Sequence, residues 1–247
     1  MIDAKLNLAD AAKIPLAAAE TVVEWGNVLI VAPHPDDESL GCGGAIALLR
    51  RFNLEVSILI LSDGTLSHPN SQKYPKEKLR DLRETELKSA AQILGVGEKS
   101  VKFFRFPDRA VPNANSPDFD SAVALCLDYL TQINARTIFV PWRRDPHPDH
   151  RAAFQLISRA KKTHHKIIEY PIWLYELAES VDAPLKREVS AFRLDINSVV
   201  ETKRRAIGAH VSQITALIDD DPDGFRLSGQ MLANFAAPFE VYFEEIQ

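Results

Sequence analysis

The sequence predicts an α/β fold, with a mostly parallel sheet, helices on both faces and an irregular C-terminal third. Two observations predict it: short runs rich in β-branched residues alternate with longer segments of helical period, and no linker or repeat interrupts them. A chain of 247 residues with 46% hydrophobic residues has the size and composition of one globular domain. We therefore expect one domain at residues 26–247, preceded by a helical N-terminal extension at residues 1–25, whose stretch Leu8–Val23 is rich in Ala.

The first two thirds of the chain divide into four βα units. The expected strands are short runs rich in β-branched residues, the first of which is predicted to be buried, and each following segment has helical period. Gly95 marks a helix end. The expected strands are Asn27–Ala32, Val56–Leu61, Val101–Phe106 and Thr137–Pro141, and the expected helices are Gly43–Phe52, Pro75–Leu94, Ser116–Ile133 and Asp149–Lys162.

The pattern loosens in the C-terminal third. We expect an extended segment at Lys166–Tyr175, strands at Val189–Ile196 and Glu240–Glu244, and one helix at Ser198–Thr215.

The net charge and the cysteine content limit the expected binding partners and the expected cellular compartment of the protein. The formal net charge is −5 and no basic stripe occurs, so nucleic acid is not an expected partner. The two cysteines, Cys42 and Cys126, form no CxxC pair, which favours a reducing compartment. We expect a cytoplasmic protein without a membrane span, because no secretory pattern and no apolar run of roughly 20 residues is present.

Three of the ten glycines fall within Gly41–Gly44, after the first strand. A dinucleotide-binding turn would place G-x-G-x-x-G directly at the strand end. Here the strand ends near Ala32 and the loop Pro33–Leu40 comes before the first glycine, and Ile46 stands where the last glycine of the pattern belongs. The pattern therefore disfavours nucleotide binding.

Two loops at strand ends carry side chains that suit a metal. His34, Asp36 and Asp37 follow the first strand, and His147 and His150 follow the fourth. Open α/β sheets bind ligands at the carboxyl ends of their strands, and clustered carboxylates repel one another unless a cation is present. Two imidazoles and one carboxylate are the ligand count of a catalytic zinc site, and ferrous iron would suit them too.

A plainer interpretation stays open for the second loop. His147 and His150 could cap the following helix and pair with Asp145 or Asp149 without any metal.

These residues carry a family resemblance. Pro33-His34-Pro35-Asp36-Asp37-Glu38, then Gly41–Gly44 and His147-Pro148-Asp149-His150, resemble the LmbE-like, or PIG-L, family of zinc-dependent N-acetylglucosamine deacetylases. The resemblance runs from about Val28 to His150 and implies a Rossmann-like deacetylase fold. It implies that His34, Asp37 and His150 hold Zn²⁺, that Asp36 is the general base and that His147 stabilises the oxyanion.

Physical reasoning is compatible with these roles. In a loop held near extended geometry, the side chains of Asp36 and Asp37 would diverge, so that one ligates and the other faces water. A metal lowers the pKa of that water, and Asp36 would then take its proton and pass it to the leaving amine. A protonated His147 would stabilise the negative oxygen of the tetrahedral intermediate.

Four further positions match the family less sharply. Arg83, in a segment similar to the family's R-x-x-E-L helix, is the predicted substrate contact; the alternative is a surface Arg paired with Glu86. Asp108 resembles the aspartate that contacts sugar hydroxyls; the alternative is a plain turn residue. Lys203 and His210 share a helix face, and we expect them behind the site.

The resulting functional prediction is a metal-dependent N-deacetylase of an N-acetylglucosaminyl-type small molecule. Two alternatives remain: an amidase that acts on a thiol conjugate of an amino sugar, and a non-catalytic carbohydrate-binding protein on the same fold. The resemblance leaves a homo-oligomer open, and the aglycone, acyl length and choice of zinc or iron are not encoded in recognisable motifs.

Overall fold

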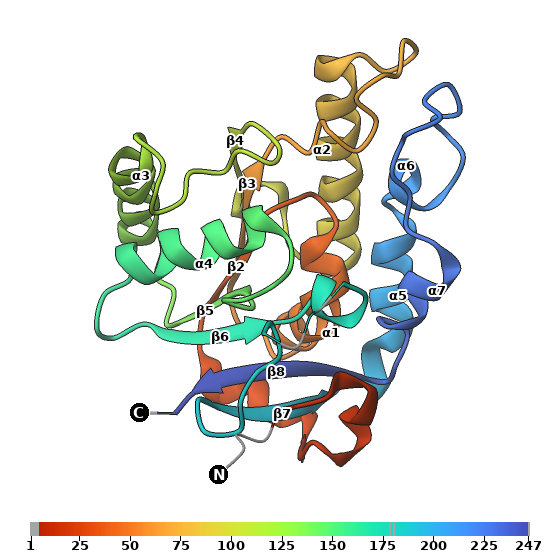
Figure 1. The fold of residues 1–247 in the computed structure, drawn as a ribbon. Helices are drawn as coiled ribbons and strands as arrows, with labels where there is room; N and C mark the ends of the chain where they lie inside the picture. The colour runs from red at the N-terminus through yellow and green to blue at the C-terminus, as the bar shows by residue number, and fades with distance from the viewer. Residues whose placement is uncertain (1–4, 178, 180, 247) are drawn as a thin grey trace.

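The computed structural model describes residues 5–177, 179 and 181–246 and contains an eight-stranded sheet with helices on both faces (Figure 1). The strand order is β1-β7-β8-β6-β5-β2-β3-β4, and only β8 is antiparallel to its neighbours, so the predicted mostly parallel α/β sheet is confirmed. The strands are β1 (Leu16–Ala17), β2 (Val28–Ala32), β3 (Val56–Ser62), β4 (Val101–Phe106), β5 (Thr137–Pro141), β6 (Lys166–Tyr170), β7 (Val189–Asp195) and β8 (Phe239–Glu245).

The helices divide between the two faces. Helices α1, α2 and α5 cover one face, and α3 and α4 cover the other (Figure 1). The α-helices are α1 (Asp37–Arg51), α2 (Lys76–Ile93), α3 (Phe119–Gln132), α4 (Pro148–Ala160), α5 (Val200–Gly208), α6 (Val211–Ile214) and α7 (Gly229–Ala233), and the 3-10 helices are η1 (Leu8–Lys13), η2 (Ala19–Trp25), η3 (Glu98–Ser100), η4 (Trp173–Tyr175) and η5 (Asn197–Val199).

Strand β2 shows why its sequence is apolar throughout. Ile30 packs into the core under α1 and α2, while Leu29 and Val31 pack on the other face against α3 and α4. Successive side chains of a strand point to opposite faces, so a strand covered on both faces has no polar position. The apolar run that predicted this strand is therefore a direct consequence of its central place in the sheet.

The N-terminal region differs from a regular helical extension. Residues 8–25 form two 3-10 helices separated by β1, which pairs with β7 at the sheet edge. Ala11 and Ile14 pack with Trp142 and Phe243 in a small separate core. Residues 1–4 of the predicted extension lie outside the described residues, and the division into an extension and one domain stays a prediction.

Helix α1 begins earlier than the sequence suggested. The glycines were expected at its opening, but the helix starts at Asp37, so the loop after β2 contains only residues 33–36. A Cβ on Gly41 would lie 2.3 Å from Cδ2 of Tyr170, and one on Gly44 would lie 2.6 Å from Cγ2 of Ile196. The glycines therefore allow β6 and the segment after β7 to pack closely against a helix, and they do not form a turn.

Two C-terminal expectations were partly wrong. The single helix expected at Ser198–Thr215 is broken at Ala209 and His210, which separate α5 from α6. The extended segment expected at Lys166–Tyr175 ends at Tyr170 and continues as η4. Both breaks bring side chains towards the same end of the sheet, a long-range outcome that local periodicity does not encode.

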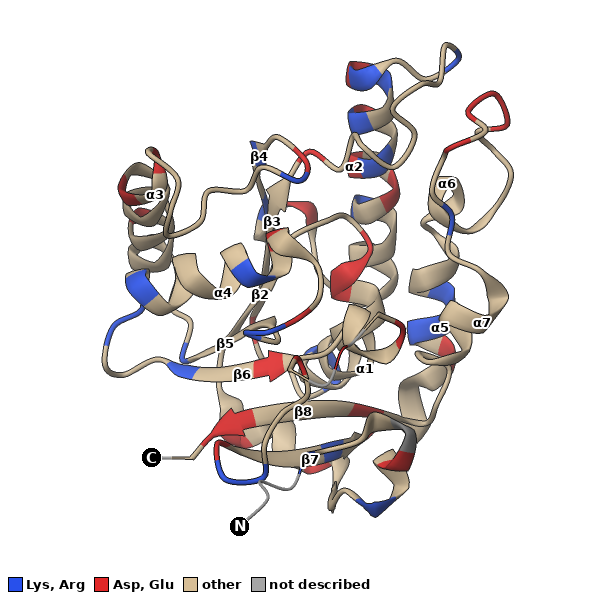
Figure 2. Ribbon diagram, viewed as in Figure 1, with Lys and Arg blue, Asp and Glu red and all other residues tan. Residues whose placement is uncertain are grey.

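Charged residues are distributed over several elements. Figure 2 shows Lys and Arg interspersed with Asp and Glu along α2, α5 and the sheet edges. Among the described residues, no helix combines the length and the hydropathy that crossing a membrane requires.

The close packing at Gly44 yields a stability prediction. Gly44→Ala places a Cβ against Cβ, Cγ2 and Cδ1 of buried Ile196, so we expect the free energy of unfolding to fall by about 1–3 kcal/mol. Gly208→Ala is the matched control, because nothing lies within 4 Å of its added Cβ and Ala favours a helix. Urea denaturation measures both variants, and equal midpoints for Gly44→Ala and the wild type would contradict the packing argument.

Candidate metal centre

The site lies where two neighbouring parallel strands end. Strands β2 and β5 pair directly, and the chain leaves β2 towards β3 on one side while β5 lies on the other. Their loops meet at this switch point, where open α/β sheets bind their ligands. The ring centroid of His34 is 4.7 Å from that of His147 and 5.5 Å from that of His150.

Asp37 lies between two of these imidazoles, in the first turn of α1. Its Oδ2 is 3.2 Å from Nδ1 of His34 and 3.2 Å from Nε2 of His150. All three residues are buried. Although burial alone would raise it, the contacts with His150 and His34 hold the pKa of Asp37 well below its usual range, so the carboxylate is ionised. Three candidate donors of different elements therefore converge.

The second nitrogen of each imidazole faces another carboxylate. Nε2 of His34 is 3.1 Å from Oδ2 of Asp149, and Nδ1 of His150 is 3.3 Å from Oδ1 of Asp145. Histidines that bind metals commonly donate their other ring N–H to a carboxylate, which fixes the ring and its tautomer. His34 has this arrangement with Asp149, and Asp145 lies beside the corresponding nitrogen of His150.

His150 fits a ligand role by a second observation. Its side chain is fully buried, and neither ring nitrogen makes a hydrogen bond of good geometry among the described residues. A buried polar atom without a partner is costly, and a cation would satisfy it. Ligand atoms of His34, His147 and His150 lie within 4.8 Å of one another, so these three imidazoles could also hold a metal together.

A rival set shares His34 but uses Asp108 and Asp149. These two carboxylates already accept backbone N–H groups: Oδ2 of Asp108 accepts from Leu66, and the oxygens of Asp149 accept from Arg109 and Val111. Their oxygens thus hold loops together. Oδ2 of Asp37 likewise accepts a backbone N–H, from His34 at 2.9 Å, so these contacts do not separate the two sets. The Asp37 set is favoured because it includes His150, whose buried ring nitrogens have no hydrogen-bond partner among the described residues.

Asp36 has a strained backbone that sequence reasoning did not foresee. The prediction of near-extended geometry is wrong, because φ is 135° and ψ is −30°, in a region that non-glycine residues rarely adopt. Its N–H donates to Oε2 of buried Glu38 at 3.0 Å, and Nη2 of Arg83 lies 3.3 Å from its Oδ2. The side chains of Asp36 and Asp37 do diverge, but through this turn.

The same surroundings set the proton affinity of Asp36. Burial raises its pKa to about 6, while the Arg83 guanidinium opposes the rise. A carboxylate with such a pKa can accept a proton near neutral pH and release it again.

His147 differs from the expectation of an imidazolium. Burial and the neighbouring His150 and His34 lower its pKa to about 3, so the ring is neutral near neutral pH. Its Nδ1 accepts the N–H of Asp149 at 3.2 Å, which leaves Nε2 to carry the hydrogen. His147 therefore offers an N–H dipole and no positive charge.

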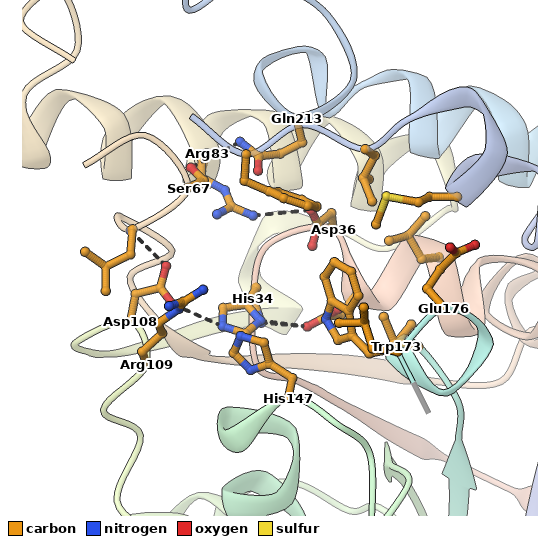
Figure 3. Close-up of a pocket in the computed structure, with 18 of the residues that line it drawn as sticks. His34, Asp36, Ser67, Arg83, Asp108, Arg109, His147, Trp173, Glu176 and Gln213 are labelled. Carbon is orange, nitrogen blue, oxygen red and sulfur yellow. Dashed lines mark hydrogen bonds and ion pairs between the residues drawn. The ribbon is translucent and has the colours of Figure 1, made fainter. Parts of the chain in front are cut away.

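Arg83 and Asp108 line the same cavity as His34, Asp36 and His147 (Figure 3). The surface pair of Arg83 with Glu86 is wrong: Arg83 is buried and donates to the carbonyl oxygens of Gly64 and Pro35 at 2.7 Å each. Asp108 Oδ1 is 3.3 Å from Nε2 of His34. Both side chains hold the loops of the site and border the cavity.

Lys203 and His210 lie behind the site and do not line the cavity. Nζ of Lys203 pairs with Oε1 of Glu240 at 2.7 Å, and the Glu240 carboxylate also accepts the N–H groups of Gly44 and Ala45 in α1. Nε2 of His210 is 3.0 Å from Oε1 of Glu38. Lys203 thus anchors α1 and His210 supports the residue that holds Asp36.

Sequence reasoning missed three contributors. Glu38 was read only as part of the motif, Asp145 only as a pairing alternative, and Trp173 not at all. The signal for Asp145 was its place beside two histidines at a strand end. Trp173 follows β6, a neighbour of β5, so its position after a parallel strand was the available clue.

Comparison of the chain with known proteins identifies its family. The family model described as GlcNAc-PI de-N-acetylase (PIG-L) matches residues 29–161, which is more than half of the chain. The chain belongs to the PIG-L family. It is a deacetylase of this family, a hydrolase that acts on amide C–N bonds.

Individual relatives agree with this assignment. A probable N-acetyl-α-D-glucosaminyl L-malate deacetylase 2 of Bacillus cereus is 28% identical over 78% of this chain and 86% of its own length. The diacetylchitobiose deacetylase of Thermococcus kodakarensis is 27% identical over 75% and 69%. The zinc inhibited form of teicoplanin deacetylase Orf2 shares the fold, with a TM-score of 0.66 and 17% identity over 89% of this chain and 98% of that one.

Glu38 yields a prediction about this PIG-L site. Its carboxylate accepts from the Asp36 N–H, the Ser39 hydroxyl and His210, all of them buried. Glu38→Ala would leave these groups without an acceptor, at roughly 1–3 kcal/mol each, so we expect at least about 3 kcal/mol less stability. Exposed Glu24→Ala is the control and should stay within about 0.5 kcal/mol of the wild type. Equal urea midpoints for Glu38→Ala and the wild type would show that the network is not formed.

Proposed function

We propose that this protein is a zinc-dependent hydrolase that removes an N-acetyl group from an N-acetylglucosaminyl-type substrate. One observation carries the proposal: His34 and His150 each direct one nitrogen to the Asp37 carboxylate and the other to a further carboxylate, beside Asp36. Curated relatives named as deacetylases of N-acetylglucosaminyl malate, of diacetylchitobiose and of a 2-acetamido-2-deoxyglucopyranoside support the substrate class.

His34, Asp37 and His150 are the proposed ligands. Two imidazole nitrogens and one carboxylate oxygen match the preference of zinc and leave a position for reactants, and ferrous iron suits the same donors. The metal, when bound, polarises the amide carbonyl and lowers the pKa of water. Asp149 holds the His34 ring in orientation through its hydrogen bond with Nε2, and the Asp145 carboxylate lies 3.3 Å from Nδ1 of His150.

Asp36 is the proposed general base. Its pKa of about 6, raised by burial, allows the carboxylate to take a proton from water and deliver it to the departing amine. Arg83 keeps the carboxylate in place through its contact with Oδ2 and with the Pro35 carbonyl oxygen. Arg83 on the side chain and Glu38 on the backbone N–H therefore both hold the strained turn of Asp36.

His147 is proposed to stabilise the oxyanion as a neutral N–H donor. The donor is Nε2, because Nδ1 is engaged with the Asp149 N–H. Arg83 and Asp108 border the cavity and are the proposed contacts to sugar hydroxyls. Each already has protein partners, so a substrate would add to those contacts.

The ligand assignment predicts which variants lose zinc. Asp145→Ala removes a carboxylate that lies beside a ligand, and such a loss typically lowers metal affinity by roughly 10–100-fold. Asp37→Ala and His150→Ala remove a ligand itself, so they should lower zinc affinity by more than this. His147→Ala and exposed His164→Ala should bind zinc nearly as the wild type does. Isothermal titration of the metal-free proteins, with circular dichroism to verify folding, measures these affinities.

The rival sets make opposite predictions. Lost affinity in His147→Ala with retained affinity in Asp37→Ala would assign the metal to the three imidazoles. Lost affinity in Asp108→Ala with retained affinity in His150→Ala would assign it to the set that contains Asp149.

The proposed chemistry is tested by acetate release from N-acetylglucosamine and a panel of its glycosides. For zinc-loaded Asp36→Asn we expect kcat to fall by about 10²–10⁴-fold while one equivalent of zinc stays bound. Asp120→Asn, on the exposed side of α3, should retain activity.

Undiminished release by Asp36→Asn would exclude Asp36 as the base. Absence of release from every glycoside by the wild type, with zinc bound, would favour the alternatives: a thiol conjugate of an amino sugar as the substrate, or a carbohydrate-binding role.

A further inference from the structure

The cavity beside the metal centre has two different ends. Its volume is about 390 Å³. One end holds His34, Asp36, Asp108, Arg109 and His147, and in Figure 3 Glu176 lies away from them on the far side of Trp173. The lining also includes six large apolar side chains from the C-terminal third, here called the apolar wall, which are Trp173, Leu177, Phe225, Leu227, Met231 and Phe235.

The wall is assembled from segments far apart in the sequence. Trp173 lies in η4, Met231 in α7, and Phe225 in the segment between α6 and α7. The ring of Trp173 lies at 5.6 Å from that of Phe225, edge to face, and at 6.4 Å from that of His147, nearly parallel. Trp173 thus connects the apolar wall directly to the reacting end of the cavity.

The wall offers few groups for sugar hydroxyls. Glu176 is the charged residue at this end, and its Oε1 already accepts from Nδ2 of Asn234 at 2.5 Å. Gln213 lies at the other side, with its Nε2 bonded to the Ser212 hydroxyl at 2.9 Å. A hydroxyl-rich group placed on the wall would lose water without gaining comparable partners, which costs affinity.

An apolar group on the wall has the opposite effect. Each methylene removed from water strengthens binding by about fourfold. A cavity of about 390 Å³ is in the range that holds ligands of drug size, so an N-acetyl monosaccharide would leave the wall largely unused.

We propose that the substrate of this site is an amino sugar that carries an apolar aliphatic or aromatic substituent, which packs on the wall formed by Trp173, Phe225 and Met231. This inference rests on the proposed function and names its substrate more closely. The substituent can be part of the N-acyl group or of the aglycone, because both reach the cavity with the same surface chemistry.

The test compares matched substrates below their micelle-forming concentrations. N-hexanoylglucosamine is compared with N-acetylglucosamine, and the hexyl glycosides of N-acetylglucosamine with the methyl glycosides, in both anomers. The zinc-loaded protein is assayed by the amine released. We expect kcat/KM to rise by at least about tenfold in one of the two comparisons, mainly through KM. The comparison that responds identifies which side of the amide carries the apolar group.

A polar variant of the wall supplies the second readout. Met231→Gln keeps the length of the side chain and should reduce the ratio of hexyl or hexanoyl to short-chain kcat/KM by several-fold. Leu125→Gln is the control, because Leu125 is exposed on α3 and does not line the cavity, and its ratio should equal that of the wild type.

The outcomes separate this inference from the proposed function. Equal kcat/KM for long and short substituents in both comparisons would overturn the inference and leave the deacetylase proposal intact. If no compound is hydrolysed, the proposed function fails, and titration of the hexyl and methyl glycosides into the zinc-loaded protein decides the inference: tighter hexyl binding supports the apolar wall, and equal or absent binding overturns it.

Discussion

The contact of the Asp37 carboxylate with two imidazoles is the interaction on which the rest of the site depends. It brings together His34 after β2, His150 in α4 and the first turn of α1. The direct pairing of β2 with β5 makes it geometrically available, and the carboxylates of Asp149 and Asp145 lie beside the outer nitrogens of the two rings. A displacement of either strand end would separate all of these groups.

Maintaining so many buried polar groups requires partners from the whole chain. Glu38 and Arg83 hold the strained turn of Asp36, and the pair of Lys203 with Glu240 holds α1 from below. Buried charges are costly unless they are paired and hydrogen-bonded. The apolar core on each face of the sheet supplies the hydrophobic stabilisation that offsets this cost. The C-terminal third therefore supports the centre, although it contributes no predicted ligand.

Local patterns were sufficient for the sheet and the meeting of the two loops, because apolar runs report strands and parallel strand ends share one edge. Local patterns did not predict the features that depend on contacts between residues far apart in the sequence. The start of α1 was misplaced because Gly41 and Gly44 serve the packing of Tyr170 and Ile196, which no local signal reveals. The positive φ of Asp36 depends on Glu38 and Arg83, and the apolar wall near Trp173 joins segments more than fifty residues apart.

The proposed site holds one metal ion between the ends of β2 and β5. The most direct measurement is a crystal structure of the zinc-loaded protein with anomalous diffraction data recorded on both sides of the zinc edge. We expect one anomalous peak within bonding distance of His34, Asp37 and His150, with Asp36 beside it and not ligating. A peak held by His34, Asp108 and Asp149, or no peak at this edge of the sheet, would contradict it.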